Sequence, residues 1–132
     1  MSQTKNKKET ASRLAEALSG RDELTCLQAF VVAGDLSAPP LAVGNTATEL
    51  SVRITNCQLG LFRGEDGKRP VTPAADVSPE LEQAIGEGVV LGRLPCAVAW
   101  ALAARFGVKR SQVANAAEKL GMRFSQCQLG TF

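Results

Sequence analysis

The chain of 132 residues contains no histidine, no tyrosine and a single tryptophan. The absence of histidine removes the commonest general acid–base group and a frequent metal ligand. The sequence also lacks a glycine-rich phosphate-binding loop and a nucleophile signature. These absences predict that the protein is not an enzyme, and no cofactor is expected. Because aromatic residues are scarce, the core is expected to consist mainly of alanine, valine and leucine.

Long hydrophobic runs are missing as well, and no segment approaches the roughly 20 apolar residues that a membrane-spanning helix needs. The first ten residues are polar and lack the apolar region of a secretory signal. Four cysteines are present, but no two of them form a Cys-x-x-Cys pair. Without an export signal, such thiols are expected to stay reduced. We therefore predict a cytoplasmic protein that has no membrane partner.

The chain contains an internal repeat. Residues 21–62 and 91–132 align without a gap at a constant offset of 70, and 14 of the 42 aligned pairs are identical. The identical pairs include Asn45/Asn115 and Arg53/Arg123, and both segments end in Cys-Gln-Leu-Gly-x-Phe. Such a repeat predicts two related units. Since 42 residues is close to the lower limit for an independent core, the units are expected to pack on each other or within a homodimer.

Hydrophobic periodicity and turn residues predict a mainly α fold with short β-strands. In domain terms, we expect a disordered basic tail over residues 1–10, a first unit over 11–62, a wing or linker over 63–77 and a second unit over 78–132. Helices are expected at 11–19, 26–35, from 40 onward, 79–85, 96–106 and 111–120. Alternating patterns predict strands at 52–57 and 122–127, and a further strand over 71–76.

The two central helices of the second repeat carry a small residue, Ala103, followed four positions later by Gly107. Apolar residues flank this pair at Leu102, Phe106 and Val113. The pattern resembles prokaryotic winged helix-turn-helix DNA-binding proteins, here as a tandem duplication. In such motifs the small residue lets the second helix cross closely, and glycine allows the sharp turn. The resemblance implies a transcriptional regulator that binds double-stranded DNA through the second helix of each motif.

The charge distribution favours the second repeat as the DNA-contacting copy. Residues 91–132 carry a net charge of +5, whereas residues 21–62 carry −2. Asparagine and glutamine can bind adenine in a bidentate manner, while lysine and arginine reach guanine or phosphate. The predicted DNA-binding residues in and after the second helix of this repeat are Lys109, Arg110, Ser111, Gln112, Asn115, Lys119 and Arg123, and the first repeat adds Asn45 and Arg53.

The first repeat departs from the pattern, since Ser37 replaces the turn glycine and Pro39-Pro40 replaces Lys109-Arg110. It can read DNA weakly, with the loop from Arg63 to Arg69 as a wing on phosphates, or serve as a packing unit. Two other functions remain open. One is a protein-interaction or scaffold module on the same fold. The other is a metal or redox sensor that uses the paired thiols of Cys26, Cys57, Cys96 and Cys127, although their spacing is more typical of buried structural cysteines than of metal ligands.

Overall fold

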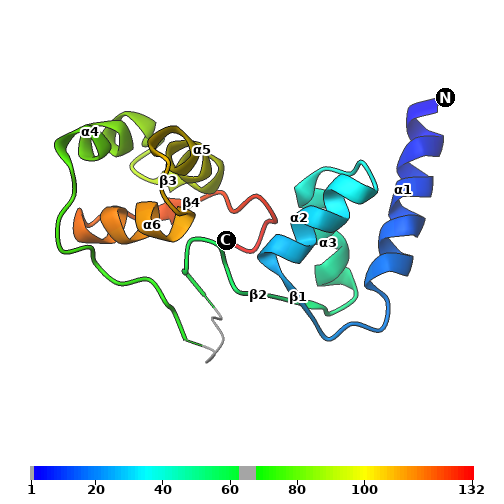
Figure 1. The fold of residues 1–132 in the computed structure, drawn as a ribbon. Helices are drawn as coiled ribbons and strands as arrows, with labels where there is room; N and C mark the ends of the chain where they lie inside the picture. The colour runs from blue at the N-terminus through cyan, green and yellow to red at the C-terminus, as the bar shows by residue number, and fades with distance from the viewer. Residues whose placement is uncertain (1, 63–67) are drawn as a thin grey trace. The chain divides into compact units, whose positions relative to one another are not determined.

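The computed structural model describes residues 2–62 and 68–132, with side chains from residue 9 onward. These residues form six helices and four short strands (Figure 1). The prediction of a mainly helical protein with short strands is therefore confirmed. In chain order the elements are α1 (Ser2–Leu18), β1 (Glu23–Thr25), α2 (Cys26–Asp35), α3 (Pro40–Glu49), β2 (Arg53–Thr55), α4 (Pro79–Gly88), β3 (Leu94–Pro95), α5 (Cys96–Phe106), α6 (Arg110–Lys119) and β4 (Phe124–Ser125).

Helix α1 is longer than the sequence pattern predicts. It begins at Ser2, whereas residues 1–10 were expected to be a disordered tail. The buried side chains of Leu14 and Leu18 anchor its last turns. Extending a helix that is already nucleated costs far less than starting one, and the preceding glutamine, lysine and glutamate residues favour helix. The helix therefore continues to the N-terminal end of the described chain.

Each helical hairpin lies between two strands that pair in parallel. In the first repeat β1 pairs with β2, so that Leu24 lies opposite Ile54. In the second repeat β3 pairs with β4, and Leu94 lies opposite Phe124. The sequence predicted the later strand of each pair but missed the earlier one, which is only two or three residues long. A parallel pair needs a crossover connection, and here the helical hairpin supplies it.

The further strand expected over residues 71–76 does not form, and residues 69–74 have no regular secondary structure. Pro70 and Pro73 have no N–H group to donate to a strand ladder. The N–H groups of Val71 and Thr72 donate to Gly60 and Asn115 instead. This part of the predicted wing is therefore not a hairpin, and Arg63 to Gly67, the rest of that loop, lie outside the described residues.

The two repeats use the same turns with different residues. Gly107 ends α5 in the left-handed region at φ 64°, and Ser37 occupies the same position after α2 at φ 52°. A serine in this region is less favourable than a glycine, so the first repeat keeps the turn at some cost in stability. The turn predicted from Gly107 is confirmed, and its equivalent exists although the glycine is absent.

The chain divides into two compact units that do not coincide with the two repeats. Unit 1 comprises residues 1–56 and 129–131, and unit 2 comprises residues 57–128 together with Phe132. We call residues 57–62 tail 1 and residues 127–132 tail 2. Tail 1 follows the first repeat but belongs to unit 2, while Leu129–Thr131 of tail 2 belong to unit 1. The two repeats have therefore exchanged the ends of their repeated Cys-Gln-Leu-Gly segments.

Each exchanged leucine completes the core of the unit that receives it. Leu59 is fully buried and belongs to the core of unit 2. Leu129 is 2% exposed, and its backbone passes so close to α3 that a Cβ atom on Gly44 would lie 1.7 Å from the Leu129 carbonyl oxygen. The matching residue on α6, Ala114, has a Cβ atom and is fully buried beside tail 1. Each unit therefore buries one tail leucine, which is consistent with the presence of the tail in both repeats.

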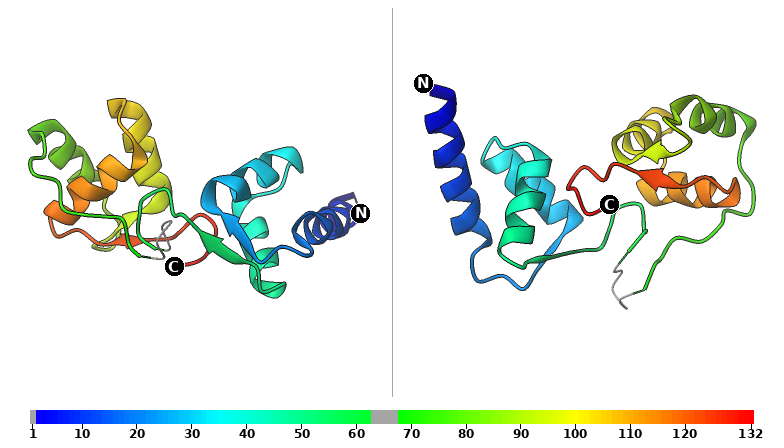
Figure 2. Two further views of the ribbon diagram at one scale, coloured as in Figure 1. Left: turned by 60° about the horizontal axis from the view of Figure 1, so that its bottom comes forward. Right: turned by 180° about the vertical axis from the view of Figure 1, so that it is seen from behind.

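Helices of the second repeat surround a core of small apolar side chains, as the composition predicts. On α6, Val113, Ala116 and Ala117 are buried, and Leu120, which lies on the same side at helical spacing, is half-buried. Helix α4 lies beside α5 (Figure 2). Its residues Ala84 and Ile85 belong to this core. Its start is capped as expected, because the Ser78 hydroxyl accepts a hydrogen bond from the Leu81 N–H.

Candidate nucleic-acid interface

Both repeats contain two helices joined by a tight turn. Helices α2 and α3 are bent by 114° relative to each other across a break of four residues. Helices α5 and α6 are joined by only three residues, Gly107 to Lys109. A helix-turn-helix motif has helices at about 90–120° joined by three or four residues. The measured hairpin in unit 1 lies within this range.

Arg110 begins α6 and is held by contacts within unit 2. Its guanidinium carbon lies 3.6 Å from the centroid of the Trp100 ring, a close cation–π contact. Its Nη1 atom donates a hydrogen bond to Gln58 Oε1 at 3.4 Å. The first repeat has Pro40 and Phe30 at the matching positions and cannot form this contact. Arg110, predicted to contact DNA, therefore holds tail 1 at the start of α6.

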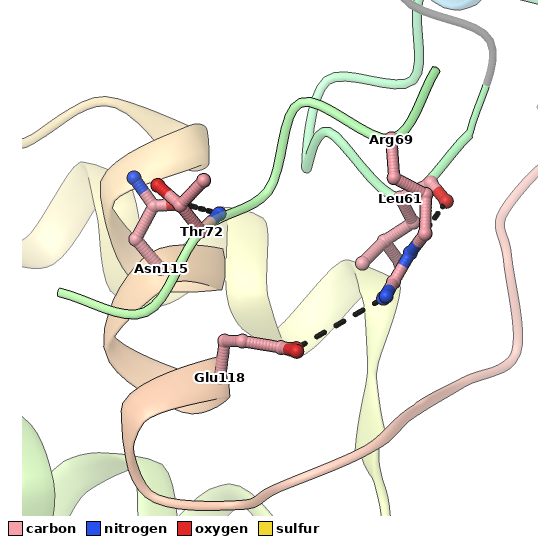
Figure 3. A network of polar contacts seen from close by, with 5 residues as sticks. All are labelled: Leu61, Arg69, Thr72, Asn115 and Glu118. Carbon is pink, nitrogen blue, oxygen red and sulfur yellow. Dashed lines mark hydrogen bonds and ion pairs between the residues drawn. The ribbon is translucent and has the colours of Figure 1, made fainter.

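Asn115 lies in the middle of α6 and contacts a segment that we call the strap, residues 69–74. The Thr72 N–H donates to Asn115 Oδ1 at 3.1 Å, and the Ala74 N–H donates to the Asn115 carbonyl oxygen at 2.9 Å. One turn further on, Glu118 forms a 3.9 Å ion pair with Arg69 (Figure 3). The strap thus covers the face of α6 on which Asn115 lies.

Four predicted DNA-binding residues of the second repeat remain exposed: Lys109, Gln112, Lys119 and Arg123. Of these, Gln112 also stabilises the start of α6, because its Oε1 atom accepts a hydrogen bond from the Lys109 N–H. Ser111 is half-buried. Three exposed cations therefore lie at the start of α6, at its end and just beyond it.

The strand pairs differ in charge between the repeats. In the first repeat Arg53 forms a 3.4 Å ion pair with Glu23, the residue opposite it in the neighbouring strand. Both side chains are more than half exposed, so the pair adds little stability. In the second repeat Arg93 replaces the glutamate, and its guanidinium donates to the Phe124 carbonyl oxygen. Unit 2 therefore has two cations, Arg93 and Arg123, at the positions where unit 1 has the Glu23–Arg53 ion pair.

Arg93 was not among the predicted site residues. The internal repeat could have identified it. Arg93 aligns with Glu23, so the charge is reversed at this position, whereas Arg53 and Arg123 keep the same residue in both repeats. In the first repeat, Asn45 is exposed on α3, and its Oδ1 atom lies 3.9 Å from where a Cβ atom on Gly130 would be. Asn45 and Arg53 belong to unit 1, and the other seven predicted residues belong to unit 2.

Three of the four cysteines, Cys57, Cys96 and Cys127, belong to unit 2. Desolvation by burial raises the pKa of the Cys57 thiol, and the neighbouring Cys127 thiol raises it further. Burial likewise raises the pKa of Cys96, even though Gln128 Nε2 donates a hydrogen bond to its sulfur. The start of a helix generally favours a thiolate, but at Cys96 desolvation by burial dominates and the pKa is raised. Among the described residues, no group of three or more cysteine or carboxylate side chains is placed to hold a metal ion.

The raised thiol pKa values predict how reactivity and stability depend on pH. At pH 8, Cys57 and Cys96 should react with iodoacetamide more slowly than free cysteine, because less thiolate is present. Because the folded state favours the neutral thiols, Cys57 and Cys96 contribute fully to stability below the pKa of an ordinary thiol, about 8.5. This contribution is lost as the pH rises through their raised pKa values in the folded state. Urea unfolding from pH 7 to 10.5 measures this loss, and alkylation as fast as that of free cysteine would contradict the assignment.

No single helix in the described part of the chain is long and apolar enough to cross a membrane, and the α2–α3 pair reaches that length only as two sharply bent helices. No known protein family, no curated protein and no solved structure matches the chain.

Proposed function

We propose that this protein binds double-stranded DNA and acts as a transcriptional regulator, with unit 2 making most of the contact. The observation that carries the proposal is the set of exposed cations along α6, the second helix of the hairpin in unit 2, and just beyond it. Lys109, Lys119 and Arg123 are exposed there, while the matching positions of the first repeat hold Pro39, Glu49 and the paired Arg53. A localised basic surface is what a protein needs to neutralise DNA phosphates.

In this proposal each repeat is a helix-turn-helix unit, and α6 is the recognition helix. The 114° bend of the hairpin in unit 1 and the three-residue turn in unit 2 support this view. In this proposal the parallel strand pairs take the place of the wing of a winged motif. Unit 1 has no lysine or arginine at the positions of Lys109 and Lys119, and in this proposal it mainly supports unit 2.

Salt-dependent DNA binding tests the proposal. Sequences bound by the protein are first selected from a random DNA pool, and their affinity is then measured by fluorescence anisotropy at several salt concentrations. The double variant Lys109→Ala/Lys119→Ala should weaken binding to every sequence. Each phosphate contact contributes about −0.9 to the slope of log K against log salt, so losing two should reduce the slope by about 1.8.

A matched control removes two exposed cations from unit 1 instead. The double variant Arg13→Ala/Arg21→Ala changes the net charge by the same amount and should leave the salt slope almost unchanged. An equal effect of both double variants would mean that binding follows net charge alone. If no DNA is bound at low salt, the proposed function is wrong.

A protein-interaction module is the second candidate, and one observation favours it. Leu27 and Val31 on α2 are 51% and 56% exposed, one helical turn apart. The matching residues on α5 are Ala97 and Ala101, so the first repeat carries the larger apolar surface. An exposed apolar pair of this kind suits contact with another protein. This candidate would replace the first if the DNA measurements fail.

A further inference from the structure

We propose that the strap is an autoinhibitory segment that competes with DNA for α6. This inference rests on the proposed function and concerns the regulation of the same surface. In the described conformation, the strap is bound and the Asn115 side chain is used within the protein. DNA that reads Asn115 must therefore displace the strap.

Both partners use the same side chain, and since an amide oxygen can accept two hydrogen bonds, they compete because the strap occupies the space beside it. An asparagine that reads adenine accepts a hydrogen bond from adenine N6 through Oδ1 and donates to N7. Asn115 Oδ1 already accepts the Thr72 N–H at 3.1 Å. Figure 3 shows Thr72 of the strap beside the Asn115 side chain. The Ala74 N–H also donates to the Asn115 carbonyl oxygen, so the strap occupies the place from which a base edge would approach Asn115.

The strap is attached at its other end to tail 1. The Val71 N–H donates to the Gly60 carbonyl oxygen at 2.9 Å, and Arg69 Nε donates to the Leu61 carbonyl oxygen at 3.1 Å. Val71 also packs against the core of unit 2. Displacing residues 72–74 therefore need not release Val71, because the two sets of contacts involve different partners.

The contacts between the strap and α6 are enough to hold the strap over Asn115, yet few enough for DNA to displace it. They are two hydrogen bonds and one ion pair at 3.9 Å, and the Arg69 side chain of that pair is 58% exposed. A net hydrogen bond in a protein changes an equilibrium by about fivefold. A binding-competent fraction reduced by this factor raises the apparent dissociation constant for DNA by the same factor.

The test compares variants of the strap that leave α6 and the net charge unchanged. Thr72→Pro removes the N–H that binds Asn115, and Thr72→Ala retains it and serves as the matched control. We expect Thr72→Pro to bind the selected DNA about fivefold more tightly than wild type, the effect of one hydrogen bond, and Thr72→Ala to bind like wild type. Ala74→Pro, which removes the second N–H, provides an independent variant if Thr72→Pro does not fold by circular dichroism.

Hydrogen exchange of the wild-type protein gives a second readout. Adding DNA should speed exchange of the Thr72 and Ala74 amides, since both lose their acceptors. If DNA binds but these amides stay protected, and the proline variants bind like wild type, the strap is not inhibitory and the proposed function stands. If Thr72→Pro binds DNA where wild type does not, the inference is supported. If neither binds at low salt, the proposed function fails and the inference with it.

Discussion

Replacing Leu59 with alanine is expected to destabilise unit 2 by about 2–5 kcal/mol, although Leu59 follows the first repeat in sequence. Its side chain is fully buried in the core of unit 2, and truncation would leave a cavity there. Trp100, the only tryptophan, lies on α5 and reports on this unit by fluorescence. Denaturant unfolding followed at this tryptophan measures the loss.

Leu129→Ala is the matched variant, because the same substitution in tail 2 removes a leucine from unit 1. Hydrogen exchange resolved by segment separates the two. Leu59→Ala should speed exchange in α5 and α6, and Leu129→Ala should speed it in α2 and α3. The reverse pattern, in which each leucine protects its own repeat, would show that the tails are not exchanged.

Gly44→Ala is the second substitution with a large expected effect. The added Cβ atom would meet the Leu129 carbonyl oxygen at 1.7 Å, and that oxygen belongs to a backbone, so the tail itself must move. Overpacking of this kind costs about 1–3 kcal/mol, which exceeds the gain of up to about 1 kcal/mol from replacing glycine in a helix. We expect lower stability of unit 1 in urea and faster amide exchange at residues 129–131.

Gly34→Ala provides the control for this change. Gly34 also lies within a helix of unit 1, but nothing lies within 4 Å of the place where its Cβ atom would be. Here the helical preference acts alone, and stability should rise by about 0.5–1 kcal/mol. Equal stabilisation by both substitutions would show that tail 2 does not rest against Gly44.

The sequence predicted most elements because each depends on local signals. Helix α2 begins and ends where the pattern of apolar residues indicates, and Gly107 and Ser78 act as turn and cap. The short strands β1 and β3 were missed because two or three residues carry too little periodicity. The strand expected at 71–76 does not form because Pro70, just before it, and Pro73, within it, cannot donate to a ladder. The N–H groups of Val71, Thr72 and Ala74 donate to tail 1 and α6 instead.

The candidate site was predicted only in part. Exposure of Lys109, Lys119 and Arg123 follows from helical spacing and from the strand pattern. The contacts of Arg110 and Asn115 do not, because Gln58 lies 52 residues from Arg110 and Thr72 lies 43 residues from Asn115. The Trp100 ring, which Arg110 also contacts, lies on the preceding helix. Side chains that suit DNA equally suit an aromatic ring or a backbone amide, so composition alone did not distinguish these partners.

The two related helical hairpins, their shared Cys-Gln-Leu-Gly ending and the excess of positive charge in the second follow from the order of the amino acids alone. Which hairpin each ending completes, and which face of α6 stays open, depends on tertiary contacts. The reason is that both tails carry the same leucine and glycine, and both hairpins offer a similar apolar surface. Identical residues cannot specify a choice between the two, and the contacts that distinguish them join residues far apart in sequence, such as Gln58 with Arg110 and Leu129 with Gly44.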